Sequence, residues 1–152
     1  MQLDDYGKPG KYLQHKGWTI VSSDGLRGTA ACNAYAKEIL VKPSAFTKPN
    51  LRVRRYVMPH EIWHGVHWVV NMYHVTELQA ARNLDRRSAI EVVADAACLR
   101  NDRSKAMRTW VTASVIWHGK VGYRYTLRDL TSPAALAAIT PLVDAVEAHH
   151  AI

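Results

Sequence analysis

Cysteine is scarce in this sequence, and long apolar runs are missing from it. The two cysteines, Cys32 and Cys98, form no CxxC pair, so neither a disulfide framework nor a cysteine-bound structural zinc site is indicated. No apolar run reaches the roughly 18 residues that a transmembrane helix needs. The N-terminus carries Asp4 and Asp5, where a secretory leader would be basic. We therefore expect a cytoplasmic protein with no membrane contact.

Composition and charge are otherwise those of an ordinary globular chain. Of 152 residues, 48% are hydrophobic and 22% are charged, which suits one domain with a hydrophobic core, and no internal repeat is visible. The net charge is +7, and the clearest basic cluster consists of Lys48, Arg52, Arg54 and Arg55. Such a cluster could contact an acidic or DNA-bound partner. A solvated surface is the simpler explanation, because no nucleic-acid-binding motif accompanies the cluster.

The most informative pattern is HExxH, which runs from His60 to His64. Residues four apart share one face of a helix, so the two imidazoles can bind one Zn²⁺. Glu61, one position on, is placed to act as a general base toward a metal-bound water. Pro59 precedes the motif, and it either begins the helix or kinks a longer helix that starts at Val53.

A catalytic zinc needs a third protein ligand. His67 shares the face of the motif but lies about 10 Å from His60 along the helix axis, so we expect it to line the cleft instead. The metzincin pattern fails, because His67 and Val70 replace its glycine and last histidine. The better candidate is Glu91, on the apolar, alanine-rich stretch 88–99, which indicates a buried helix.

Asp95 lies one helical turn beyond Glu91, so two carboxylates share one face of this apolar helix. Burying both is costly unless a cation compensates them. We expect Glu91 to bind the metal and Asp95 to accept the outer ring N–H of a ligating histidine. In the alternative interpretation, Ser88 and Glu91 form a capping box and Asp95 is a solvated surface residue.

The two motifs, HExxH and ExxAD, together resemble those of the gluzincin-type zincin metallopeptidases, and most closely the ImmA/IrrE-type family, whose second motif is typically ExxAN or a near variant. The similarity covers roughly residues 17–100. It implies a zinc metalloendopeptidase in which His60, His64 and Glu91 bind the metal and Glu61 is the catalytic base. The substrate would be a dedicated regulatory protein, such as a repressor, and the setting a phage or another mobile element.

This chain departs from that family at Pro59, where a helix former is usual, and at Asp95, which replaces the commoner asparagine. A SprT-like protein is also compatible with the first motif. That family usually takes a downstream histidine as third ligand, and His74 is the only near candidate. Two further alternatives are a catalytically silent zincin-fold binding protein and a DNA-associated regulator with a structural zinc.

We expect hydrolysis of a peptide bond in a protein or peptide substrate by zinc-activated water, with Glu61 moving the proton. A donor to the developing oxyanion is needed as well. The possible substrate or oxyanion contacts are His67, His118, Tyr123 and Tyr125.

For the fold, we expect an irregular N-terminal arm over residues 1–16 and one zincin-like α+β domain over 17–152. A short mixed or antiparallel sheet would pack on the HExxH helix, with several further helices. The strands are predicted at 18–21, 29–36 and 38–41. Residues 104–117 show helical spacing, and Tyr123, Tyr125 and Leu127 alternate as in a short strand. Two short helices are predicted to start at Pro133 and Pro141.

Overall fold

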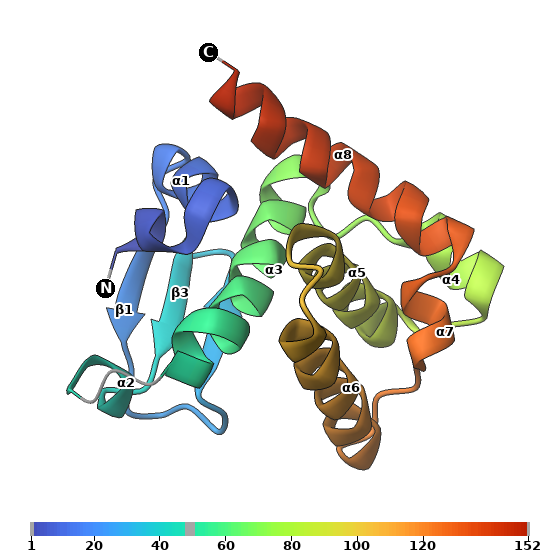
Figure 1. Ribbon diagram of the computed structural model, residues 1–152, viewed down its shortest axis with the longest axis horizontal. Coiled ribbons are helices and arrows are strands. Elements are labelled where there is room, and N and C mark those ends of the chain that lie inside the picture. Colours follow the sequence, from blue (N-terminus) through green and yellow to red (C-terminus); the bar gives the residue numbers. More distant parts are fainter. Residues whose placement is uncertain (1, 48–50, 152) are drawn as a thin grey trace.

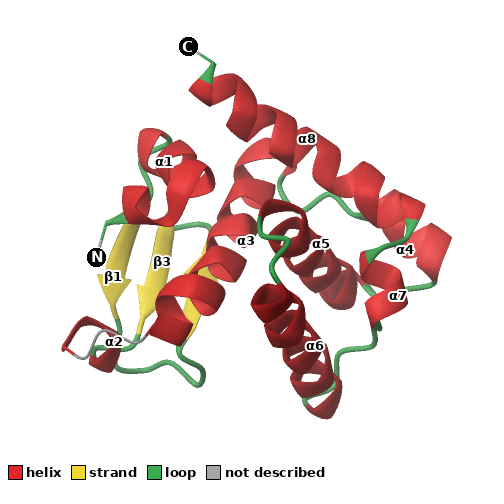
Figure 2. Ribbon diagram, in the orientation of Figure 1, coloured by secondary structure: helices red, strands yellow, loops and turns green. Residues whose placement is uncertain are grey.

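Helices make up most of the structure, and a three-stranded sheet forms one side of it (Figures 1 and 2). The computed structural model describes residues 2–47 and 51–151, so Lys48 of the basic cluster lies outside the described residues. The α+β class expected from the sequence is confirmed. The helices are η1 (Leu3–Tyr6), α1 (Gly7–His15), α2 (Ser44–Thr47), η2 (Val53–Val57), α3 (Met58–Asn71), α4 (Thr76–Arg82), α5 (Arg86–Asn101), α6 (Lys105–Lys120), α7 (Leu127–Leu130) and α8 (Pro133–His150).

The sheet is mixed and has the strand order β1-β3-β2. Its strands are β1 (Thr19–Ser22), β2 (Ala30–Asn33) and β3 (Glu38–Val41). Strand β1 runs parallel to β3, whereas β2 is antiparallel to β3 and forms an edge. The predicted third strand is confirmed at its full length, and the second is shorter than predicted because residues 34–37 form a turn. Both β2 and β3 contact α3, so the HExxH helix lies against the sheet.

Helix α3 is central to the molecule, because it also contacts α5, α1 and α8 (Figure 1). Its buried residues include both histidines of the motif and Ile62, Trp63 and Val66. The helix that carries the motif starts well before Pro59: residues 51–52 are helical, and the π-helical segment η2 leads directly into α3. The Met58 N–H bonds to the Val53 carbonyl five residues back. A wider turn before Pro59 accommodates its ring, which would clash with the carbonyl four residues back in a regular helix.

The expectation of an irregular arm over residues 1–16 is wrong. These residues form η1 and α1, and Leu3, Tyr12 and Leu13 are buried. Pro9 is compatible with a helix because it lies in the first turn, where the backbone N–H needs no helical partner. Gly10 is required by close packing, since a Cβ there would clash with the Leu3 carbonyl. The domain therefore begins before residue 17.

Two expectations for the C-terminal third are also wrong. Tyr123 and Tyr125 lie in an irregular segment with no paired strand, and Leu127 begins α7. Residues 133–150 form the single helix α8, which continues through Pro141. Pro141 and Ala137 are both exposed, so the carbonyl that loses its helical partner can bind water. The predicted helix after residue 104 is confirmed as α6.

None of the described helices is both long enough and apolar enough to cross a lipid bilayer.

Candidate metal centre

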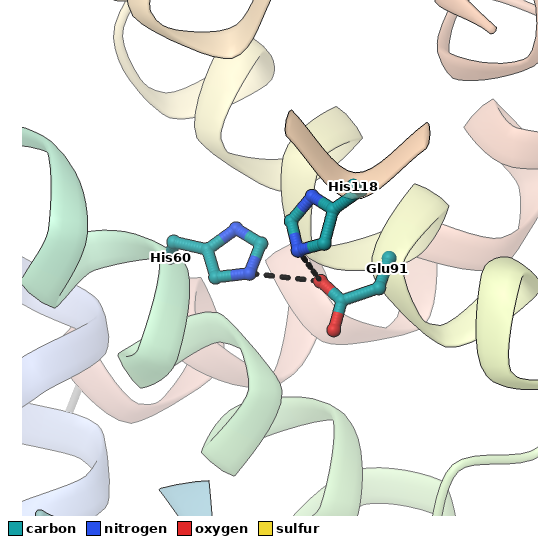
Figure 3. A group of neighbouring side chains, drawn as sticks. All are labelled: His60, Glu91 and His118. Carbon is teal, nitrogen blue, oxygen red and sulfur yellow. Dashed lines mark ion pairs between the residues drawn. The ribbon is translucent and has the colours of Figure 1, made fainter. Parts of the chain in front are cut away.

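Three helices bring polar side chains together in the middle of the molecule: His60 and His64 come from α3, Glu91 from α5 and His118 from α6. Figure 3 shows the rings of His60 and His118 directed at the carboxylate of Glu91 from two sides. His60, His64 and His118 are all buried. Burying this many polar groups together is unfavourable unless they satisfy one another or share a cation.

The two imidazoles of the motif and Glu91 converge on one point. His60 Nε2 lies 2.9 Å from Glu91 Oε2, His64 Nε2 lies 3.2 Å from the same oxygen, and the two nitrogens are 3.1 Å apart. Around a tetrahedral zinc with bonds of about 2.0–2.2 Å, neighbouring ligand atoms are roughly 3.3–3.6 Å apart. The observed spacing is slightly tighter. Lone pairs this close repel unless a proton or a metal ion lies among them, so the donor set fits a metal.

The predicted contact between Asp95 and a ring of the motif is present. Asp95 Oδ1 accepts a hydrogen bond from His60 Nδ1 at 2.8 Å, and Asp95 has no exposed surface. A proton on Nδ1 leaves the lone pair of neutral His60 on Nε2, the atom that faces Glu91. His64 lacks such a partner, because among the described residues its Nδ1 has no hydrogen bond.

The capping-box interpretation of Ser88 and Glu91 does not agree with the structure. Helix α5 begins at Arg86, and its N-cap is Asp85, whose carboxylate accepts a hydrogen bond from the Ser88 N–H. Glu91 therefore lies beyond the first turn, and its carboxylate contacts the histidines instead. The Ser88 hydroxyl accepts a hydrogen bond from the Arg124 N–H at 2.8 Å, which holds the segment after α6 against α5.

His118 is a further nitrogen donor at this centre. His60, Glu91 and His118 each offer one ligand atom, and these atoms lie within 4.8 Å of one another, so this group could hold a metal ion. His118 Nε2 is 3.7 Å from Glu91 Oε2, which is farther than either nitrogen of the motif. Both possible sets of three ligands share His60 and Glu91 and differ in whether His64 or His118 completes them.

A buried chain of hydrogen bonds fixes the ring of His118. The Tyr125 hydroxyl donates to Asp95 Oδ2 at 2.8 Å, and its oxygen lies 2.9 Å from His118 Nδ1. Since the hydroxyl proton points to the carboxylate, Nδ1 of His118 is the donor to Tyr125. Neutral His118 then has its lone pair on Nε2, which faces Glu91. Asp95 thus orients two histidines, His60 directly and His118 through Tyr125.

The electrostatics of the centre without metal follow from this geometry. Burial lowers the pKa of His60, but Asp95 and Glu91 outweigh it and hold the pKa well above the ordinary value. Burial opposes ionisation of Glu91, yet His64 and His60 keep its pKa well below the ordinary value. Burial also lowers the pKa of His118, which favours the neutral ring. Without metal, Glu91 is thus negative, and the imidazoles that it faces stabilise its charge.

Glu61 stands beside the centre, in a cleft of about 500 Å³ that His60 and His118 also line. Burial raises the pKa of the Glu61 carboxyl. A carboxyl with a raised pKa that borders a cleft can accept and return a proton near neutral pH. The cleft is bounded by η2 and α3, by the loop before β2 and by α6.

The other expected contacts lie elsewhere. His67 is 1% exposed, its Nε2 donates to the His74 carbonyl, and it does not line this cleft, so the expectation for His67 is wrong. Burial lowers the pKa of His67 to about 4. Tyr125 is buried behind His118, which makes it a support for that ring. Tyr123 packs its ring against His118 at 4.9 Å between centroids, and the Arg87 guanidinium covers Tyr123.

Of the remaining candidates, His74 is exposed and is not part of the group of ligand atoms, so it offers no third ligand of the SprT type. Cys32 lies near Tyr73, with 3.6 Å between thiol and hydroxyl, and burial raises its pKa to about 12, which keeps the thiol protonated. In the basic cluster, Arg52 lines the cleft, while Arg54 and Arg55 are exposed.

Sequence reasoning missed several residues that line the cleft, among them Arg27, Lys42, Trp110 and Trp117. None of them belongs to a motif, and only the packing of the sheet and α6 around α3 brings them together. Comparisons of the sequence with protein-family models and curated proteins gave no match, and comparison of the structure with solved structures gave none either.

Proposed function

We propose that this chain is a zinc-dependent metallopeptidase that hydrolyses peptide bonds in a protein substrate. The observation that carries the proposal is the convergence of His60 Nε2, His64 Nε2 and Glu91 Oε2 within 3.2 Å of one another, next to a cleft that Glu61 lines. These three residues would hold the ion. When bound, zinc supplies a Lewis acid that lowers the pKa of water toward about 7 and polarises the scissile carbonyl.

The chain's own residues account for the proton and for positioning. Glu61 accepts a proton from the attacking water and returns it to the leaving amine, and its raised pKa suits this exchange. Asp95 holds His60 in the tautomer that leaves Nε2 free. His118 lines the cleft, where Tyr125 fixes its ring, and it would face the substrate beside the metal.

The ImmA/IrrE-type resemblance supports a regulatory role, in which the substrate is a dedicated protein such as a repressor. The resemblance rests on the two motifs. Glu91 and Asp95 both contact His60, as expected of a metal ligand and of the residue that orients a ligating histidine. A metal centre that borders an open cleft suits a protease that acts on an exposed segment of a folded protein. Residence in a phage or mobile element and a cytoplasmic location remain part of this proposal.

The experiment is to compare purified wild-type protein with Glu61→Gln for zinc content and for cleavage of an unstructured protein such as casein. We expect one zinc per chain in both proteins and a loss of about 10²–10⁴-fold in cleavage rate for Glu61→Gln. EDTA should abolish wild-type cleavage, and zinc should restore it. Equal rates in the two proteins, or zinc-independent cleavage, would contradict the proposal.

A closed, non-catalytic metal site is the second candidate, and His118 is the observation that favours it. Four protein ligands would leave no open position for water, as in structural zinc sites. His118→Ala distinguishes the two functions. If the site is catalytic, zinc affinity changes little and cleavage falls, whereas a closed site would lose affinity to the same degree as in His64→Ala.

A further inference from the structure

The cleft beside the metal centre has one basic wall. Arg27 and Lys42 line it, and they come from the loop before β2 and from the residue after β3. The Lys42 N–H donates to the Thr29 carbonyl at 3.0 Å, which ties these two segments together. No carboxylate of the described residues forms an ion pair with either side chain. Arg52 adds a third cation to the lining.

The opposite wall is aromatic and comes from α6. Trp110 and Trp117 line the cleft there. Trp110 is held between its neighbours, since its ring stacks on Tyr56 and meets the edge of His60. Trp117 is 55% exposed, which leaves its ring available to a bound chain.

Negative charge is almost absent from this lining. Glu61 is the only carboxylate among the residues that line the cleft in the described part of the chain, and it is assigned to the chemistry. Between Arg27 and Lys42 on one side and Trp117 on the other, an extended peptide would therefore meet cations and an indole. Neighbouring cations that form no ion pair with an acidic side chain attract carboxylates, and this attraction weakens as salt is added.

We infer that the cleft selects acidic peptide segments: a carboxylate side chain binds at Arg27 and Lys42, and an apolar side chain packs on Trp117. This inference rests on the proposed peptidase function, because it names the substrate class of the same cleft. It also explains how a small enzyme with an open cleft could discriminate among exposed segments of other proteins, since charge complementarity contributes to specificity.

The test measures binding without catalysis. Zinc-loaded Glu61→Gln protein is titrated into two fluorescent pools of short degenerate peptides, identical except that one has Asp and Glu where the other has Asn and Gln. Fluorescence anisotropy should show about fivefold or greater preference for the acidic pool at low ionic strength, and the preference should shrink as salt is added. Equal affinity for the two pools would overturn the inference.

Charge-reversal variants show which residues cause the preference for acidic peptides. Arg27→Glu with Lys42→Glu, in the Glu61→Gln background, should abolish or invert the preference. The matched control, Lys11→Glu with Arg128→Glu, changes the net charge equally at exposed positions that do not line the cleft, and it should keep the preference. Loss of the preference in the control as well would show a general charge effect and would contradict a specific site.

Trp117→Ala tests the other wall. It should weaken binding of both pools by a similar factor, because it removes apolar contact without changing charge. Unchanged binding would overturn the role of Trp117. The outcomes also separate this inference from the peptidase: acidic preference with no cleavage by the wild type contradicts only the proposed function, whereas cleavage with no acidic preference contradicts only this inference.

Discussion

At the scale of single residues, Asp95 is the group on which the centre depends most. It has no exposed surface, it accepts from His60 Nδ1 and from the Tyr125 hydroxyl, and Tyr125 in turn contacts His118. One carboxylate therefore orients two of the imidazoles beside Glu91. An asparagine here could also accept from His60 through its amide oxygen, but its NH2 group could not accept from the Tyr125 hydroxyl.

Replacing Asp95 should weaken metal binding without removing a ligand. We expect Asp95→Ala to lower zinc affinity by roughly 10–100-fold, since His60 loses the acceptor that fixes its tautomer. Asp95→Asn should cost less, because its amide oxygen can still accept from Nδ1. Competition with a fluorescent chelator measures both affinities.

The matched control for this prediction is Asp129→Ala. Asp129 is also a buried carboxylate, but it pairs with Arg82 at 2.8 Å, away from the centre. Its loss should lower the unfolding temperature and leave zinc affinity unchanged. If both alanine variants weakened zinc binding equally, a general loss of stability would explain the result and the orienting role of Asp95 would be contradicted.

The charges at the centre also predict how the stability of the metal-free protein depends on pH. His60 has a pKa raised above its ordinary 6.5, so its ionised form stabilises the fold fully below that pH and this contribution is lost as the pH rises through the raised pKa. Glu91 acts in the opposite sense: its lowered pKa gives a contribution that is present above about 4.5 and lost on acidification.

Thermal unfolding in EDTA should therefore show stability that falls as the pH rises above 6.5, as the proton that bridges His60 and its carboxylates is lost. Zinc should remove this decline, because the ion takes over the role of the proton. His60→Asn in EDTA is the control and should show a flatter profile. A metal-free wild type whose stability rises over this range would contradict the account.

At the scale of elements, the position of α3 depends on close packing of Gly65 against α1 and against Trp18, which precedes β1. A Cβ on Gly65 would lie 2.6 Å from Leu13 Cδ1 and 3.2 Å from Trp18 Cζ3. Leu13 and Trp18 are themselves buried, so neither can move aside freely. The glycine next to the motif thus allows α1 to pack against the helix that carries the two histidines.

Gly65→Ala should lower the free energy of unfolding by about 1–3 kcal/mol through overpacking. The control is Gly119→Ala on α6, where an added Cβ meets nothing within 4 Å and alanine should gain up to about 1 kcal/mol in helix propensity. Urea denaturation measures both. A Gly65→Ala variant as stable as the wild type, or stabilised to the same degree as Gly119→Ala, would show that α1 does not press on α3 at this position.

Sequence patterns predicted elements well where local signals agreed. Helix α6 follows from helical spacing and strand β3 from its short apolar run, and the predicted cap Ser132 accepts a hydrogen bond from the Ala135 N–H. Local signals misled where tertiary packing decided the outcome. Gly7, Pro9 and Gly10 indicated an irregular arm, but buried Leu3 and Leu13 hold that segment in a helical form against the core.

At the scale of the whole molecule, sequence motifs indicated the proposed metal ligands, the proposed catalytic base and Asp95, but not the other residues of the site. HExxH and ExxAD place His60 and His64 on one face of one helix and Glu91 and Asp95 on one face of another, and a shared metal ion then predicts that the two faces meet. The sequence offered His118 only as one of several possible contacts, because nothing local relates α6 to α3. The basic and aromatic walls of the cleft depend on long-range packing and carry no local signal at all.

The central claim is that His60, His64 and Glu91 hold a zinc ion with one open position toward the cleft. Crystals of the zinc-loaded protein, measured on both sides of the zinc absorption edge, test it most directly. The account predicts one anomalous peak within about 2.0–2.2 Å of His60 Nε2, His64 Nε2 and Glu91 Oε2, with a non-protein ligand completing the shell. A peak bound by His118 in place of His64, a shell closed by four protein ligands, or no zinc at this position would contradict it.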